Sequence, residues 1–169
     1  MPTSPGGEPL ADFGTRAGAR VIDALIVGGF SLVLVIPVYI LLFAMVLGQA
    51  DSWTATSGPP SGVLLTFLGI WGVMFALVLL LQYLYEVEHL LRGGGQTFGK
   101  RMMKIRVVPV DPGEPLTRKH AALRWLAMVG MGFVGPLQLI DFLFPLWDKP
   151  YQQTLHDKAA RTVVVRLNA

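Results

Sequence analysis

Two long apolar runs dominate the pattern of hydrophobic and polar positions along the chain. The first extends from Ala24 to Leu47 and the second from Val63 to Tyr85, and neither contains Asp, Glu, Lys or Arg. As α-helices rising about 1.5 Å per residue, both runs are long enough to cross the roughly 30 Å hydrocarbon core of a bilayer. The pattern therefore predicts two transmembrane helices, at about residues 21–47 and 63–86.

The first run has an alternative interpretation as a cleaved signal peptide. Arg16 and Arg20 would form its basic n-region, and Gly48-Gln49-Ala50 resembles a small-x-small cleavage site. However, the apolar stretch is longer than the typical signal h-region of about 7–15 residues. Pro37 is compatible with a membrane helix, where neighbouring groups satisfy the freed carbonyl. We therefore favour an uncleaved span.

A third hydrophobic stretch, at about residues 123–147, is interrupted by charged residues and helix breakers. It contains Arg124, Gly135-Pro136 and Asp141, and ionisable groups raise the cost of simple membrane crossing. A crossing would also leave the basic C-terminal residues outside, against the positive-inside rule. We therefore favour a helix that breaks at Gly135-Pro136 and returns to the side it entered from, with a full crossing as the alternative.

The remaining segments are short. Lys104–Val110 and Arg161–Leu167 are rich in β-branched residues and are expected to pair as strands on the cytoplasmic face. Residues 1–12 are rich in Pro, Gly and small polar residues and predict a flexible tail. The expected fold is an all-α membrane protein over residues 13–169, with two transmembrane helices, a third broken or re-entrant segment and a small cytoplasmic β element.

Composition and charge support this interpretation and give it an orientation. Hydrophobic residues make up 53% of the chain and charged residues 15%, against about a quarter charged in ordinary soluble domains. The loop at residues 48–62 has no Lys or Arg, whereas basic residues precede the first run and recur from Arg92 to Arg124. The positive-inside rule therefore predicts a multi-pass cell-membrane protein with its N-terminus in the cytoplasm.

The basic loop after the second run also predicts a partner. It has no interleaved aromatic residues for base stacking, so anionic lipid headgroups explain its charge better than nucleic acid. Lipid is therefore the expected partner, together with further copies of the chain, because two or three helices rarely enclose a pathway alone.

No segment carries a recognisable catalytic motif. Cysteine is absent, and residues 94–100 match only the first seven positions of a phosphate-binding loop, with Arg101 in place of the required Ser or Thr. Glu86, Glu88 and His89 lack a recognised metal-ligand spacing. We expect no enzymatic activity, no cofactor and no bound metal.

The charged residues at the start of the first helix are the main candidate site. Arg16 and Asp23 are two helical turns apart and share a face, and Arg20 lies one turn before Asp23. An unpaired Asp in a bilayer costs about 2.5–3.5 kcal/mol on insertion scales, so Arg16 or Arg20 is expected to pair with Asp23. The group is either a structural ion pair or a proton or cation site.

At these residues the sequence resembles the RDD family of membrane proteins. Three ordered motifs carry the resemblance: Phe13-x-x-Arg16-x-x-Ala19-x-x-Ile22-Asp23; Gly95-Gln96-Thr97-Phe98-Gly99-Lys100-Arg101 before Ile105–Val108; and Gln153-Thr154-Leu155-His156-Asp157-Lys158 before Thr162–Val165. The resemblance implies that Arg16 and Asp23 are the family's arginine and first aspartate. It assigns Asp157 as the second aspartate, with Asp141 as the alternative.

The same resemblance guides the functional hypothesis. Members of the family are mostly uncharacterised, a transport role has been proposed for them, and some resemble sodium/proton antiporters. The leading hypothesis is transport of a small ligand or of a cation or proton through an oligomeric helix bundle. The alternative is a non-catalytic scaffold or assembly factor that binds anionic lipid or a protein partner through the basic loop.

Overall fold

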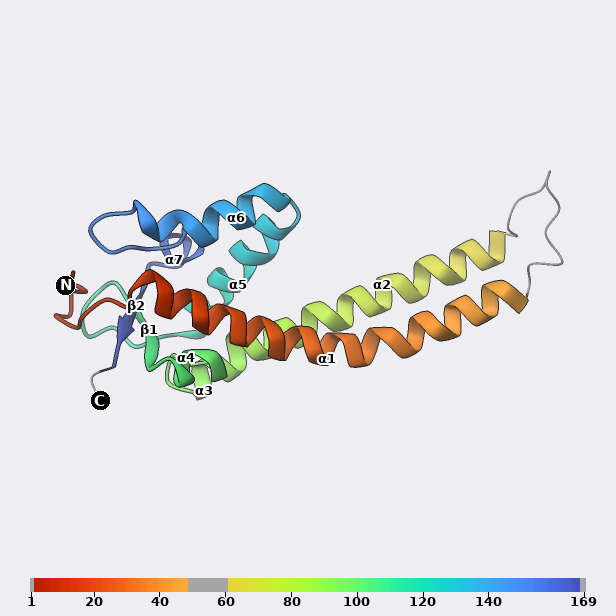
Figure 1. The fold of residues 1–169 in the computed structure, drawn as a ribbon, viewed down its shortest axis with the longest axis horizontal. Helices are drawn as coiled ribbons and strands as arrows, with labels where there is room; N and C mark the ends of the chain where they lie inside the picture. Colours follow the sequence, from red (N-terminus) through yellow and green to blue (C-terminus); the bar gives the residue numbers. More distant parts are fainter. Residues whose placement is uncertain (1, 49–60, 168–169) are drawn as a thin grey trace. The chain divides into compact units, whose positions relative to one another are not determined.

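The computed structural model describes residues 2–48 and 61–167 and is mostly helical (Figure 1). Its elements, in chain order, are α1 (Phe13–Gly48), α2 (Ser61–Tyr83), the π-helix η2 (Leu84–His89), α3 (Leu90–Arg92), α4 (Phe98–Met102), β1 (Ile105–Pro109), α5 (Arg118–Gly132), α6 (Gly135–Leu143), the short 3-10 helix η3 (Phe144–Leu146), α7 (Leu155–Ala159) and β2 (Thr162–Arg166). One compact unit comprises residues 26–81, and the other comprises residues 1–25 and 82–169.

The unit of residues 26–81 is a helical hairpin with an apolar surface. Large side chains such as Val33 and Leu65 are exposed. In the most apolar segment of each long helix, only 6% of the residues are buried. Trp71 Nε1 donates a hydrogen bond of 2.7 Å to the Tyr39 hydroxyl across the hairpin. Apolar surface on this scale requires apolar surroundings, so the two predicted membrane helices are confirmed. The predicted outer loop, residues 48–62, falls almost entirely outside the described residues.

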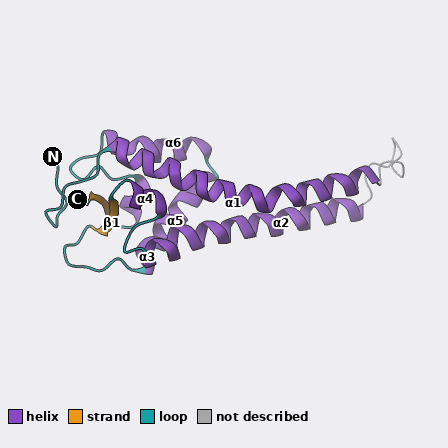
Figure 2. Cartoon of the chain, turned by 60° about the horizontal axis from the view of Figure 1, so that its bottom comes forward, coloured by secondary structure: helices purple, strands orange, loops and turns teal. Residues whose placement is uncertain are grey.

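The other unit is organised around the expected two-stranded sheet. β1 and β2 pair antiparallel, with Val107 opposite Val164. Val87 of η2 and Leu90 of α3 pack with this sheet in one buried cluster. Figure 2 shows how little of the chain is strand, in agreement with the expected all-α fold with a small β element.

The helix of the third hydrophobic stretch is interrupted at Gly135-Pro136, as the sequence predicted. α5 ends at Gly132 and α6 begins at Gly135, with the proline in its first turn. α6 buries its one charged side chain and exposes apolar ones, because Asp141 is 5% exposed whereas Leu139 is 61% exposed. A helix of this kind is suited to apolar surroundings.

The N-terminal segment differs from the predicted flexible tail. Leu10 and Ala11 are buried, Leu10 forms a β-bridge with Val165, and the Ala11 amide donates to the Val164 carbonyl at 3.0 Å. The composition of residues 1–12 gave no sign of this, because two apolar residues are too few to show a pattern. The free edge of β2 supplies the backbone partners that order the segment.

Candidate functional site

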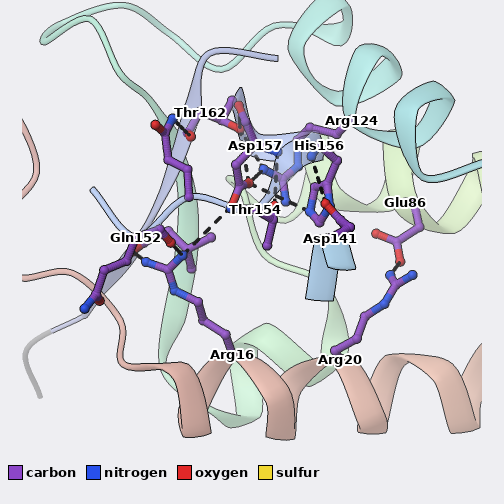
Figure 3. A network of polar contacts seen from close by, with 12 residues as sticks. Arg16, Arg20, Glu86, Arg124, Asp141, Gln152, Thr154, His156, Asp157 and Thr162 are labelled. Carbon is purple, nitrogen blue, oxygen red and sulfur yellow. Dashed lines mark hydrogen bonds and ion pairs between the residues drawn. The ribbon is translucent and has the colours of Figure 1, made fainter. Parts of the chain in front are cut away.

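Arg16 connects the start of α1 to three separate segments of main chain. Its Nε donates to the Ala11 carbonyl at 2.9 Å, its Nη2 donates to the Val164 carbonyl at 3.1 Å, and its Nη1 donates to the Gln152 carbonyl. Figure 3 shows the side chain reaching from the helix toward Gln152. All three guanidinium nitrogens are therefore committed to holding the backbone in place.

Asp157 is the centre of a second buried cluster. Its side chain accepts a hydrogen bond from Arg124 Nη1, and Arg16 Nη1 lies 3.9 Å from its other oxygen. It also forms a capping box with Thr154 at the start of α7. Burial by itself raises the pKa of Asp157, but the Arg124 guanidinium and neighbouring positive charges outweigh it, so the pKa lies well below the usual aspartate value.

Asp141 and His156 form a third pair beside this cluster. The His156 Nδ1 lies 2.7 Å from one Asp141 oxygen, and the His156 amide donates to the other at 3.0 Å. The far ring nitrogen of His156 is 3.9 Å from Asp157. The two candidates for the family's second aspartate are therefore linked through one imidazole (Figure 3).

Asp23 is held by η2 and by the start of α4, and not by its own helix. Its carboxylate accepts hydrogen bonds from the Tyr85 hydroxyl at 2.6 Å, the Thr97 hydroxyl at 2.6 Å and the Gly99 amide at 2.8 Å. Lys100 Nζ lies 3.5 Å away. The predicted pairing of Asp23 with Arg16 or Arg20 is therefore wrong: packing brings residues about 75 positions away closer than the neighbours on the same helix.

The partner of Arg20 is Glu86. Arg20 Nη1 lies 2.8 Å from one Glu86 oxygen, and Lys100 Nζ lies 4.0 Å from the other. The Arg20 side chain is 41% exposed, whereas that of Lys100 is 12% exposed. Arg20 is thus the most accessible cation of the site.

The glycine-rich loop is shaped by close backbone approach. A Cβ atom at Gly95 would lie 2.3 Å from the Val107 carbonyl oxygen, and one at Gly99 would lie 2.3 Å from the Ala19 carbonyl oxygen. Gly95 also has a φ of +88°, which favours glycine. These close contacts explain why glycine occupies both positions of the motif: they allow Thr97 and Lys100 to pack against α1.

A cavity of about 510 Å³ lies beside these groups. It is lined by the charged side chains described above other than Asp23, together with apolar side chains from α1, α5 and α6. This volume is in the range of small-molecule sites. Within residues 2–48 and 61–167, no group of three or more His, Asp or Glu residues is placed to hold a metal ion.

The structure thus brings the predicted residues into two neighbouring places. Arg16, Asp141, His156 and Asp157 meet around α7, and Asp23 meets Thr97, Gly99 and Lys100 at the start of α4. Sequence reasoning missed the role of Arg124, whose only signal was a charge within an apolar stretch. It also missed the Arg20–Glu86 pair, for which no spacing rule exists.

Three comparisons with known proteins bear on this arrangement. A family model described as the RDD family matches residues 10–161. The proline-rich antigen of Mycobacterium leprae (strain TN) is 35% identical over 100 residues, which cover 58% of this chain and 38% of that protein. A proline-rich antigen homolog of Mycobacterium tuberculosis (strain CDC 1551 / Oshkosh) is 38% identical over 72 residues, or 42% of this chain and 28% of that protein. The chain therefore spans about a third of the length of these relatives. No solved structure matches it.

Proposed function

Because the chain belongs to the RDD family and is an integral membrane protein, we propose that it transports a small ligand, with the charged cavity at the start of α1 as the binding site. Charged groups near membrane helices are costly unless they are paired, and they commonly mark ligand or ion pathways. The observation that carries the proposal is the cavity itself, which combines an accessible cation with several carboxylates.

The sheet and α6 support a location of this cavity at the inner membrane surface. Val110 and Arg161 flank the third hydrophobic stretch, and the Val110 amide donates to the Arg161 carbonyl at 2.9 Å. A sheet of two strands cannot straddle a bilayer, so both ends of the stretch belong on one side. We infer that α5 and α6 enter the membrane and return, and that the cavity beneath them faces the cytoplasm.

A complete pathway requires more helices than one chain supplies. The two long helices of a single chain leave nearly all their apolar surface exposed, and two helices cannot surround a polar route. We infer a homo-oligomer in the cell membrane, with its N-terminus in the cytoplasm and its basic loop against anionic headgroups.

Flux in reconstituted vesicles tests the proposal. In one assay, a pH dye inside the proteoliposomes reports proton movement driven by a Na⁺ or K⁺ gradient. In the other, a fluorescent phosphatidylglycerol reports translocation of lipid between the leaflets. We expect flux in one of these assays, and a loss of at least fivefold for Glu86→Gln, which changes the cavity charge. Glu114→Gln, with an exposed carboxylate outside the cavity, is the matched control and keeps wild-type flux.

A non-catalytic scaffold is the second candidate function. α4 presents the exposed apolar side chains of Phe98 and Met102 beside the exposed Arg101 and Lys104. This combination suits an anionic membrane surface or a partner docked on it. A scaffold predicts no flux in any of the assays and an enrichment of anionic lipid around the protein that disappears at high salt.

A further inference from the structure

The chemical class of the ligand can be argued from the charges that line the cavity. Four guanidinium or ammonium groups line it against three carboxylates. The ligand class rests on the proposed function of this cavity as a ligand site. An excess of fixed positive charge in a partly enclosed space favours an anionic ligand.

The carboxylates are already occupied by partners. Asp157 is bonded by Arg124, and Asp141 is bonded by His156 through both of its oxygens. Glu86 has a cation near each oxygen. A cationic ligand would therefore have to displace an existing pair before it could bind.

Arg20, in contrast, has donors to spare. Its Nη1 bonds Glu86, and within residues 2–48 and 61–167 its Nε and Nη2 have no hydrogen-bond or ion-pair partner. A guanidinium has five N–H donors in a fixed fork that suits bidentate binding of a phosphate or carboxylate. Ala17 and Ala24 lie one helical turn before and after Arg20 and line the same cavity. Their small side chains leave space for a ligand beside the Arg20 guanidinium.

The rest of the wall is apolar. Phe13 and Phe142 meet edge to face, with ring centroids 5.4 Å apart, and both line the cavity together with Leu139. A small inorganic anion would leave this surface uncovered. An aliphatic chain would cover it, and the burial of its methylene groups would strengthen binding.

We propose that the cavity binds an anionic amphiphile, with its phosphate or similar headgroup on Arg20 and its aliphatic chain between the apolar side chains of α1 and α6. The ligand is either a membrane phospholipid or a free amphiphile of the same chemistry. In both cases the headgroup and the chain contribute separately to affinity.

Isothermal titration of the full chain in dodecyl maltoside tests both contributions. Decyl phosphate is compared with inorganic phosphate, which lacks the chain, and with decyltrimethylammonium, which reverses the charge. We expect decyl phosphate to bind at least tenfold more tightly than either. Arg20→Gln should weaken decyl phosphate at least tenfold, whereas Arg101→Gln, with an exposed cation outside the cavity, should leave it unchanged.

Ala17→Leu tests the site independently of charge, because it fills the cavity while keeping every ionic group. It should also weaken the binding of decyl phosphate at least tenfold, without lowering the melting temperature by more than a few degrees.

Native mass spectrometry with phosphatidylglycerol and phosphatidylcholine identifies the source of the ligand. Selective retention of phosphatidylglycerol that Arg20→Gln abolishes indicates a membrane lipid. Binding of decyl phosphate without retention of phosphatidylglycerol indicates a free amphiphile.

Several results would overturn this inference: decyltrimethylammonium binding as tightly as decyl phosphate, Arg101→Gln weakening binding as much as Arg20→Gln, or Ala17→Leu having no effect. Binding of decyl phosphate without flux in any vesicle assay would contradict the proposed transport but support the proposed ligand class. Flux in a protein that binds no amphiphile would support transport but contradict the ligand class.

Discussion

Arg16 and Asp23 share a helix face, yet they do different jobs at separate places. The Arg16 guanidinium holds three main-chain carbonyls, two of which belong to segments distant in the sequence. The Asp23 carboxylate accepts from the Tyr85 hydroxyl of η2 and, at the start of α4, from the Thr97 hydroxyl and the Gly99 amide. Both are nearly saturated with partners, which favours a structural role for the pair and leaves Arg20 as the residue available to a ligand.

Arg16→Lys tests the structural role of the guanidinium. An ammonium group can reach at most part of the three carbonyls, and each buried acceptor left unpaired costs about 1–3 kcal/mol. We expect the free energy of unfolding to fall by roughly 2–4 kcal/mol. Thermal unfolding in detergent measures this, with Arg101→Lys as an exposed control. Equal melting temperatures for the two variants would show that the carbonyl contacts contribute little.

Asp157 predicts how stability depends on pH. Because its pKa is lowered in the folded protein, its ionised form stabilises the fold fully above the unfolded-state pKa of about 3.9. That stabilisation is lost as the pH falls from about 5 toward the folded-state pKa. Asp157→Asn should therefore have a lower melting temperature at pH 7 and a smaller loss between pH 6 and pH 3.5. Parallel curves for wild type and variant would contradict the assignment.

The sequence was a better guide to which residues matter than to what they contact. Motif resemblance selected Arg16, Asp23 and Asp157, and all three are buried or nearly so. Helical spacing then suggested partners on the same helix, because i, i+3 and i, i+4 neighbours are the only contacts that spacing reveals. The partners Lys100 and Arg124 come from packing between distant segments, which no local pattern encodes.

At the scale of elements, the structure depends on where glycine lets two backbones approach. α4 sits against α1 at Gly99, whose missing side chain leaves room for the Ala19 carbonyl and for the Asp23 carboxylate. The sequence showed these glycines only as part of a family motif and of an incomplete phosphate-binding pattern. It could not show that Gly99 would contact the first helix.

Gly99→Ala is expected to disrupt this contact. The new Cβ would lie 2.3 Å from the Ala19 oxygen, so α4 must shift and the hydrogen bonds to Asp23 must lengthen. We expect a fall in melting temperature of at least 5 °C or a loss of folded yield. Gly130→Ala is the matched control, since nothing lies within 4 Å of its Cβ position in α5; it should be neutral or slightly stabilising. Similar behaviour of the two variants would refute the close-contact explanation.

For the whole molecule, the pairing of β1 with β2 limits how the chain can cross the membrane. The strands lie on either side of α5 and α6 in the sequence and are hydrogen-bonded over residues 105–109 and 162–166. The apolar runs predicted the two membrane helices, and Gly135-Pro136 predicted the break in the third hydrophobic stretch. The sequence did not predict that residues 10–11 are ordered, because the sheet edge that holds them exists only after folding.

Cysteine labelling tests this topology directly, since the chain has no native cysteine. We expect Glu114→Cys and Lys149→Cys to react with an impermeant maleimide from the same side of the membrane, and Thr54→Cys to react from the opposite side. Reaction of Lys149→Cys together with Thr54→Cys would mean that the third stretch crosses.

The Arg16 contacts also have a consequence for biosynthesis. Two of its acceptor carbonyls belong to Gln152 and Val164, which leave the ribosome long after the first helix has been handed to the translocon. Until then this guanidinium has only the Ala11 carbonyl among its three backbone partners. Closure of the unit that contains the sheet must therefore follow synthesis of β2, and a nascent chain halted before β2 would expose unpaired polar groups to quality-control proteases.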